Sequence, residues 1–166
     1  MQTIFVLDEK NYTEDMPVFE RYGVRAIIQR DGLFAMQQSN TGEYKIPGGG
    51  MDKGETIAEA LAREVREETG LVIKIETMQE LGEILDVHKD IFDGKSKYVA
   101  HSLHYSCDVE EELVETAMTE SEIAKGFHLA WADIDTIIET NERLMKENWQ
   151  LRDTKFLRWY KENYMK

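Results

Sequence analysis

The stretch Gly48–Leu71, GGGMDKGETIAEALAREVREETGL, places a run of glycines ahead of a segment that carries several carboxylates. Thr56 and Glu59 have the spacing of a capping box, in which each side chain hydrogen-bonds the other residue's backbone N–H at the start of a helix. Gly70 occupies the position where a left-handed residue commonly ends a helix. The pattern therefore predicts a helix over 57–69 that follows a glycine-rich loop.

This predicted helix turns acidic side chains toward the edge of its apolar face. With about 100° per residue, Glu67 lies toward solvent, whereas Glu64 and Glu68 approach the apolar stripe. Glu64 and Glu68 are also a like-charge pair at i,i+4, which is unfavourable on an exposed helix and more so where water is excluded. Arg63 can pair with Glu67, but no residue of the helix is expected to neutralise the Glu64/Glu68 pair.

A divalent cation would compensate such a pair of carboxylates. Mg²⁺ takes hard oxygen ligands, keeps several of its waters and commonly bridges carboxylates to substrate phosphates. The alternative is that these glutamates are simply good helix formers on a solvated surface. Their position beside the apolar face favours a metal site over that alternative.

The same residues resemble the signature of the Nudix hydrolase family, G-x5-E-x7-R-E-U-x-E-E-x-G-U, in which U is an aliphatic residue. Every specified position is matched, by Gly49, Glu55, Arg63, Glu64, Val65, Glu67, Glu68, Gly70 and Leu71. The resemblance implies the α/β fold of that family, an α-β-α sandwich with a mixed sheet. It also implies hydrolysis of a phosphoanhydride bond in a nucleoside diphosphate linked to another moiety.

The resemblance implies metal ligands from one helix and from the loop before it. They are Glu64, Glu67 and Glu68, together with the backbone carbonyl of Gly48 or Gly49. The implied metal is Mg²⁺, or Mn²⁺ in its place. Glu55 and Arg63 would hold the ligands in position, because an arginine can bind a carboxylate through two parallel hydrogen bonds.

Two parts of the chain can supply the carboxylate that takes a proton from the attacking water. Glu64 and Glu68 are candidates within the signature. Many members of the family place a further glutamate in the loop before the last strand, and here that loop contains Glu115, Glu120 and Glu122. We assign the role to Glu120 or Glu122; the alternative is that both lie at the capped start of a solvated helix.

The rest of the sequence has the pattern of one α/β domain. The chain has 166 residues, 42% of them hydrophobic, and no linker or repeat divides it, so a single domain over 1–166 is expected. Asp31-Gly32 is a hairpin signal between expected strands at 23–28 and 33–36. Further strands are expected at 44–46, 71–85, 97–107 and 127–131, and helices at 133–146 and 151–163. The strands at 71–85 and 97–107 are expected to pair, with helices on both sides of the sheet.

Composition restricts the partners. The net charge of −13 argues against a nucleic acid polymer, whereas a small anionic nucleotide is compatible with bound cations. The apolar run at 4–7 is too short for a signal peptide or a membrane span, so we expect a cytoplasmic protein without membrane association. Cys107 is expected to be a buried small side chain.

Other polar and aromatic residues are weaker candidates. His101 and His104 should face opposite sides of one strand and so should not share a metal. Residues 108–115 are expected to form a solvated acidic loop; the alternative is that one of its carboxylates reaches the metal cluster. A late series of aromatic residues has near-helical spacing, which favours helix packing or the surface of a homodimer. The series is Trp149, Phe156, Trp159, Tyr160 and Tyr164.

Departures from subfamily patterns narrow the substrate. Features typical of ADP-ribose and dinucleoside polyphosphate enzymes use a proline or a tyrosine beyond the signature, where this chain has residues 86–89, DVHK. A nucleoside triphosphate, canonical or modified, is therefore the leading expectation. The alternatives are a nucleotide-sugar or ADP-ribose pyrophosphatase, and a Nudix-like module that senses a nucleotide without cleaving it. An isoprenoid isomerase of the same fold would need further His, Cys and Glu ligands.

Overall fold

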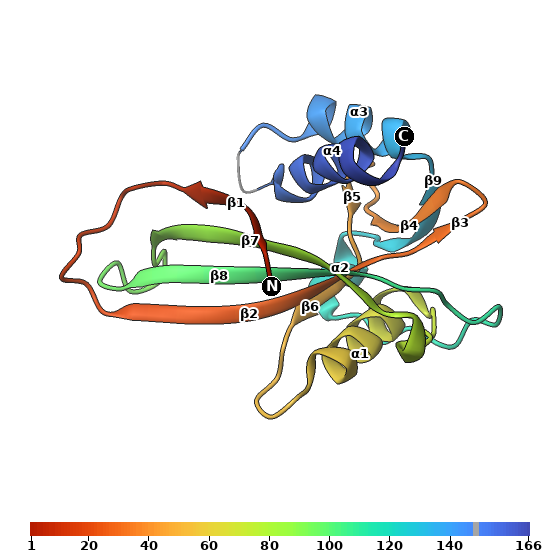
Figure 1. Ribbon diagram of the computed structural model, residues 1–166, viewed down its shortest axis with the longest axis horizontal. Coiled ribbons are helices and arrows are strands. Elements are labelled where there is room, and N and C mark those ends of the chain that lie inside the picture. Colours follow the sequence, from red (N-terminus) through yellow and green to blue (C-terminus); the bar gives the residue numbers. More distant parts are fainter. Residues whose placement is uncertain (148–149) are drawn as a thin grey trace.

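A mixed five-stranded sheet forms the centre of the fold (Figure 1). The computed structural model describes residues 1–147 and 150–166. The spatial order of the strands is β1 (Thr3–Asp8), β7 (Gln79–Lys89), β8 (Lys97–Ser106), β2 (Val18–Ile27) and β6 (Gly48–Gly50). β1 pairs with β7 and β2 with β8 in parallel, whereas β7 with β8 and β2 with β6 are antiparallel. The predicted pairing of the strands now seen as β7 and β8 is confirmed.

A second sheet is built around β4 (Leu33–Gln38). β9 (His128–Ala132) pairs antiparallel with β4, and the short strands β3 (Gln29–Arg30) and β5 (Tyr44–Lys45) pair with its two ends. Asp31 and Gly32, with φ of 52° and 77°, form the tight turn between β3 and β4. The predicted hairpin is therefore present, but its first strand is β3, because the expected strand at 23–28 belongs mainly to β2 in the larger sheet.

Helices cover the sheets from two sides, as Figure 1 shows. α1 (Ile57–Thr69) packs on β2 and β6, and apolar residues such as Val24, Leu61 and Leu103 fill that interface. α3 (Ile134–Leu144) and α4 (Arg152–Tyr164) pack together on the other side, around Ile137 and Phe156. The expected α-β-α sandwich with a mixed sheet is confirmed.

Several elements differ from the prediction. Residues 71–78 do not form a strand: they contribute one β-bridge, Ile73 with Val109, and a 3₁₀ helix η1 (Ile75–Thr77) before β7 begins. β1 was not expected as an element, and the glycines expected in a loop form the short strand β6. The short helix α2 (Glu120–Ala124) corresponds to the alternative stated for Glu120 and Glu122, the capped start of a helix. α1 has the predicted bounds, and α3 and α4 lie close to theirs.

The weaker candidates occupy structural positions. Cys107 is buried, and burial raises the pKa of its thiol to about 12. His101 hydrogen-bonds Glu83, whereas His104 is fully buried and stacks on Phe156 with ring centroids 3.8 Å apart, so the two histidines do not meet.

The late aromatic residues also pack as expected within the described part of the chain. Phe156 and Tyr160 are buried, and Tyr160 stacks on the exposed Tyr164. Trp149 lies outside the described residues. No helix within 1–147 and 150–166 has the length and apolar character to cross a membrane.

Candidate functional site

Both ends of α1 are held by the residues that predicted them. Thr56 Oγ1 accepts a hydrogen bond from Glu59 N at 3.2 Å, and Thr56 N donates to Glu59 Oε2 at 2.9 Å. Gly70 adopts the left-handed conformation at φ 76°, and its N–H donates to Arg66 O. These caps fix which way the side chains of the helix point.

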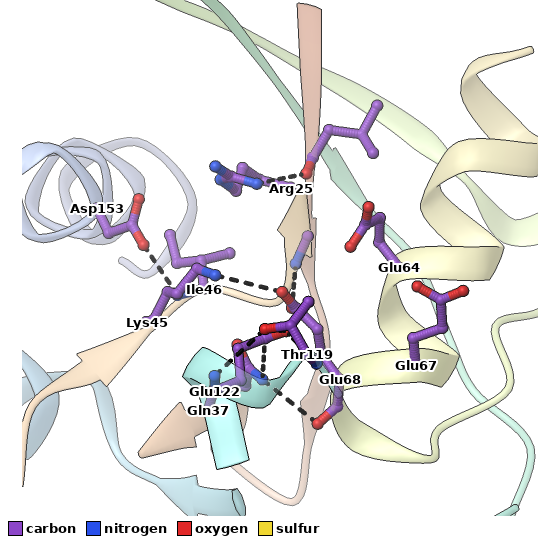
Figure 2. Close-up of polar contacts among 12 residues, drawn as sticks. Arg25, Gln37, Lys45, Ile46, Glu64, Glu67, Glu68, Thr119, Glu122 and Asp153 are labelled. Atoms are coloured by element: carbon purple, nitrogen blue, oxygen red, sulfur yellow. Dashed lines mark hydrogen bonds and ion pairs between the residues drawn. The ribbon is translucent and has the colours of Figure 1, made fainter. Parts of the chain in front are cut away.

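The glutamates of α1 differ in exposure in the predicted order. The side chains of Glu67, Glu64 and Glu68 are 33%, 15% and 5% exposed. Figure 2 shows Glu64 and Glu67 projecting from α1, and Glu68 accepts a hydrogen bond from Gly48 N at the start of β6. The three carboxylates of this helix thus range from partly exposed to buried.

Arg63 contacts Glu64 and Glu67 of the helix and also Glu55, which precedes it. Its Nε and Nη2 donate to Glu55 Oε1 at 2.5 Å and Oε2 at 2.9 Å, and its Nη1 lies 2.7 Å from Glu64 Oε1 and 3.4 Å from Glu67 Oε2. These hydrogen bonds from Arg63, and then one from the backbone N–H of Asp52, lower the pKa of Glu55 to about 2. The expectation that the helix contains no partner for Glu64 is wrong, because a helical wheel gives the direction of a side chain and not the reach of a guanidinium.

Glu68 is neutralised from outside the helix. Lys45 Nζ of β5 lies 3.2 Å from Glu68 Oε1, and Gly48 N donates to Oε2 at 2.8 Å. Burial nevertheless raises the pKa of Glu68 to about 7, against the opposing effect of Lys45. Lys45 is the cation that compensates Glu68, and it lies on a different element, so the helical pattern does not predict it.

The glycines before α1 allow close approaches. At Gly48, φ is 146° and an added Cβ would lie 1.9 Å from Val24 O, so only glycine fits there. At Gly49, an added Cβ would lie 2.4 to 2.7 Å from the carboxylate atoms of Glu64. The missing side chain at Gly49 lets the Glu64 carboxylate rest against the backbone of the loop.

Glu122 lies next to the same cluster, on α2 (Figure 2). Gln37, fully buried on β4, places its Nε2 3.4 Å from both Glu122 Oε2 and the backbone oxygen of Glu68. Burial opposes ionisation of Glu122, but hydrogen bonds from Thr119 N and Oγ1 outweigh it and lower its pKa. Glu120 and Glu115 are exposed, so Glu122 is the glutamate of this segment that the fold brings to α1.

The donor chemistry of the cluster suits a hard divalent cation: carboxylates on one helix face the backbone of a loop that Glu64 already touches. Within the described ranges no three His, Cys, Asp or Glu side chains are preassembled in a metal-binding arrangement. Arg63 and Lys45 instead occupy carboxylate oxygens of Glu64 and Glu68. The residues therefore fit a cation that shares these carboxylates with the two basic side chains.

A cleft of about 700 Å³ opens beside Lys45. Its walls come from the β4–β5 connection, the end of α2 and the first turn of α4. They include Thr41, Lys45, Lys125, Phe127, Arg152 and Asp153. A cleft of this size, with apolar and charged walls, can hold a small organic ligand.

Known proteins resemble this chain in sequence and in fold. The NUDIX domain family matches residues 20–160. An ADP-ribose pyrophosphatase of Methanocaldococcus jannaschii is 36% identical over 59 residues, covering 33% of this chain and 35% of that protein. The nucleoside triphosphatase NudI of Enterobacter sp. is 39% identical over 62 residues, covering 34% of this chain and 44% of that protein. The matched segments thus span less than half the length of these relatives.

The fold of this chain also resembles that of a solved structure. The structure of a Nudix hydrolase from Nitrosomonas europaea superposes with a TM-score of 0.61 at 18% identity, covering 88% of this chain and 93% of that one. At that identity the likeness concerns the fold alone. Because the family match spans 20–160, which is most of the chain and includes the glutamate helix, this protein belongs to the NUDIX domain family.

Proposed function

We propose that this protein hydrolyses a phosphoanhydride bond of a small nucleotide with a divalent cation held by α1. The observation that carries the proposal is the set of carboxylates on α1, of which Glu68 is buried and Glu64 touches the loop at Gly49. Arg63 and Lys45 balance this like-charged i,i+4 pair one carboxylate each, and a divalent cation would add positive charge where the carboxylates converge. Membership of the NUDIX family supports the same reaction class.

Glu64, Glu67 and Glu68 would hold Mg²⁺, or Mn²⁺, with the carbonyl of Gly48 or Gly49. The cation, when bound, lowers the pKa of an attacking water and neutralises charge on the phosphate oxygens. Glu55 and Arg63 keep Glu64 against the loop, since the Arg63 guanidinium bridges both carboxylates.

Glu122 is our choice for the carboxylate that accepts the proton of the attacking water. Its lowered pKa keeps it ionised at neutral pH, and Gln37 fixes one of its oxygens beside Glu68. Glu120 is the weaker candidate because its side chain is exposed. Glu64 and Glu68 stay alternatives, and the pKa of Glu68 is about 7 before any cation binds.

A nucleoside triphosphate, canonical or modified, is the proposed substrate class. The similarity to the nucleoside triphosphatase of Enterobacter favours it, and the similarity to the ADP-ribose pyrophosphatase of M. jannaschii makes ADP-ribose the second candidate. The other candidate function is a nucleotide sensor that does not cleave. A sensor would bind its nucleotide and release it uncleaved.

The test is a panel of nucleoside triphosphates, oxidised triphosphates, nucleotide sugars and ADP-ribose, assayed for product release with Mg²⁺. Wild type is compared with Glu68→Gln and with the control Glu139→Gln, an exposed glutamate of α3. We expect turnover in wild type and Glu139→Gln, and a loss of orders of magnitude in Glu68→Gln with the fold intact. Binding without cleavage of any panel member would favour the sensor.

A further inference from the structure

Arg25 on β2 is a partly buried arginine without an ion-pair partner in the described residues. Its Nη1 donates to Val24 O, the carbonyl of its own neighbour, at 3.1 Å, and its Nε is buried without an acceptor. The partly buried Arg63 and Arg152, by contrast, each bind a carboxylate. An enclosed guanidinium without a carboxylate is costly, so this arrangement calls for an anion.

The neighbours of Arg25 are already engaged elsewhere. Asp153 Oδ2 accepts a hydrogen bond from Ile46 N at 2.9 Å, and its Oδ1 accepts from Arg152 at 3.3 Å. Arg152 adds a second positive charge close enough to affect Arg25. Burial, and then this neighbouring guanidinium, lower the pKa of Arg25 and outweigh the opposing effect of Asp153 and of the α1 carboxylates.

The register of the sheet places Arg25 next to the glutamate cluster. Arg25 is the cross-strand partner of Gly48 on β6, and Gly48 N is bound to Glu68. Figure 2 shows Arg25 between Asp153 of α4 and Glu64 of α1. Because alternate residues of β2 face opposite sides and Val24 packs with α1, Arg25 faces the α4 side of the sheet, with its Nε buried. A chain of phosphoryl groups that starts at the α1 carboxylates would pass around the edge strand β6 to reach this guanidinium.

We propose that Arg25 binds a phosphoryl group of the substrate, adjacent to the one held at the α1 glutamates. A guanidinium offers parallel N–H donors that match two oxygens of a phosphoryl group. The ligand class is then a compound with at least two linked phosphoryl groups. This assignment rests on the proposed function, which places the adjacent phosphoryl group at the α1 glutamates and takes the compound to be a nucleotide.

The probe is methylenediphosphonate, a diphosphate analogue that cannot be hydrolysed, titrated calorimetrically in the presence of Mg²⁺. Wild type is compared with Arg25→Met, Arg25→Lys and Arg158→Met. Arg158 is an exposed arginine of α4 that pairs with Glu142, so its substitution makes the same change in net charge. We expect Arg25→Met to weaken binding about ten- to a hundredfold, Arg25→Lys to weaken it less, and Arg158→Met to stay within about twofold.

Thermal unfolding separates this role from a structural one. Because Arg25 has no ion pair, Arg25→Met should unfold at the same temperature as wild type or higher when no ligand is present, and should lose the stabilisation by the diphosphonate. Equal affinity of wild type and Arg25→Met, or no binding to wild type, would overturn the assignment. If Arg25→Met fails to fold, weakened binding by a folded Arg25→Lys supports the assignment and unchanged binding overturns it.

The binding test does not depend on turnover. Diphosphonate binding that needs Arg25, in a protein that cleaves no member of the nucleotide panel, supports the anion site while the proposed hydrolysis fails. Cleavage whose kcat and KM are both unchanged in Arg25→Met leaves the proposed hydrolysis standing and overturns the role of Arg25.

Discussion

The burial of Glu68 could be predicted from its position on α1, but its ion-pair partner could not. Its position on the helical wheel predicts a carboxylate at the apolar edge, and the side chain is indeed buried. Its partner Lys45 could not be predicted, because Lys45 comes from a two-residue strand whose place is set by pairing with β4. Gln37 was missed for the same reason: it reads as an ordinary residue of a strand and gains its role from α1 and α2.

The raised pKa of Glu68 predicts a pH dependence of stability in the metal-free protein. The pKa is about 7 in the fold against an ordinary value of 4.5, so between these values the folded state binds more protons than the unfolded one. Stability should therefore fall as pH rises through that window. Glu68→Gln removes this loss, and chemical denaturation at pH 4.5 and pH 8 should show it gaining up to about 3 kcal/mol on wild type. A difference between the two proteins that does not change with pH would contradict the assignment.

Substitution of Gly49 is expected to change Mg²⁺ binding but not the stability of the fold. A methyl group there meets the carboxylate end of the Glu64 side chain, which must turn away from β6. Gly49→Ala should therefore weaken Mg²⁺ binding about tenfold or more, with little change in melting temperature. Gly50→Ala is the matched control, because its Cβ meets the guanidinium of Arg21 instead. Equal Mg²⁺ affinity in the two variants, measured by calorimetry, would show that Glu64 needs no contact with the loop.

At the scale of elements, local signals decided which predictions succeeded. α1 has the predicted bounds because a capping box and a left-handed glycine mark its two ends. β1 carries no such marks, and it is ordered by parallel pairing with β7, far along the chain. The strand expected from residue 71 failed because η1 interrupts it, although its β-branched residues suit a strand.

The capping box of α2 predicts a difference between two otherwise similar variants. Thr119 Oγ1 donates to Glu122 Oε1 at 2.9 Å and accepts from Glu122 N, as Thr56 accepts from Glu59 N on α1. Losing either cap should cost about 1 kcal/mol of helix stability. Because a helix as short as α2 depends on its cap, Thr119→Ala should also release Glu122 and slow turnover. An equal reduction of turnover in Thr119→Ala and Thr56→Ala would contradict the proposal that Glu122 accepts the proton of the attacking water.

At the scale of the whole molecule, the site is assembled from segments that are distant in sequence. The signature helix, the glycine strand β6, the strands β4 and β5, and α2 meet where the two sheets and α1 join. The family signature predicted the acidic helix and the fold class. The cationic residues Lys45 and Arg25 depend on strand order and register, which periodicity does not encode.

Cation binding should stabilise the whole fold. A ligand that binds only the folded state at a hundredfold excess over its dissociation constant adds about 2.7 kcal/mol. Scanning calorimetry should therefore show a melting temperature that rises with Mg²⁺ in wild type and rises less in Glu64→Gln. An equal rise in both proteins would place the cation away from α1.

The central claim is that turnover depends on a cation held by α1. Its most direct test is the steady-state rate of product release from the best substrate of the panel, measured in EDTA and across a Mg²⁺ titration. We predict no turnover above background in EDTA, and saturable recovery with Mg²⁺ that Glu68→Gln does not show. Equal turnover in EDTA and in Mg²⁺ would contradict a metal-dependent site on this helix.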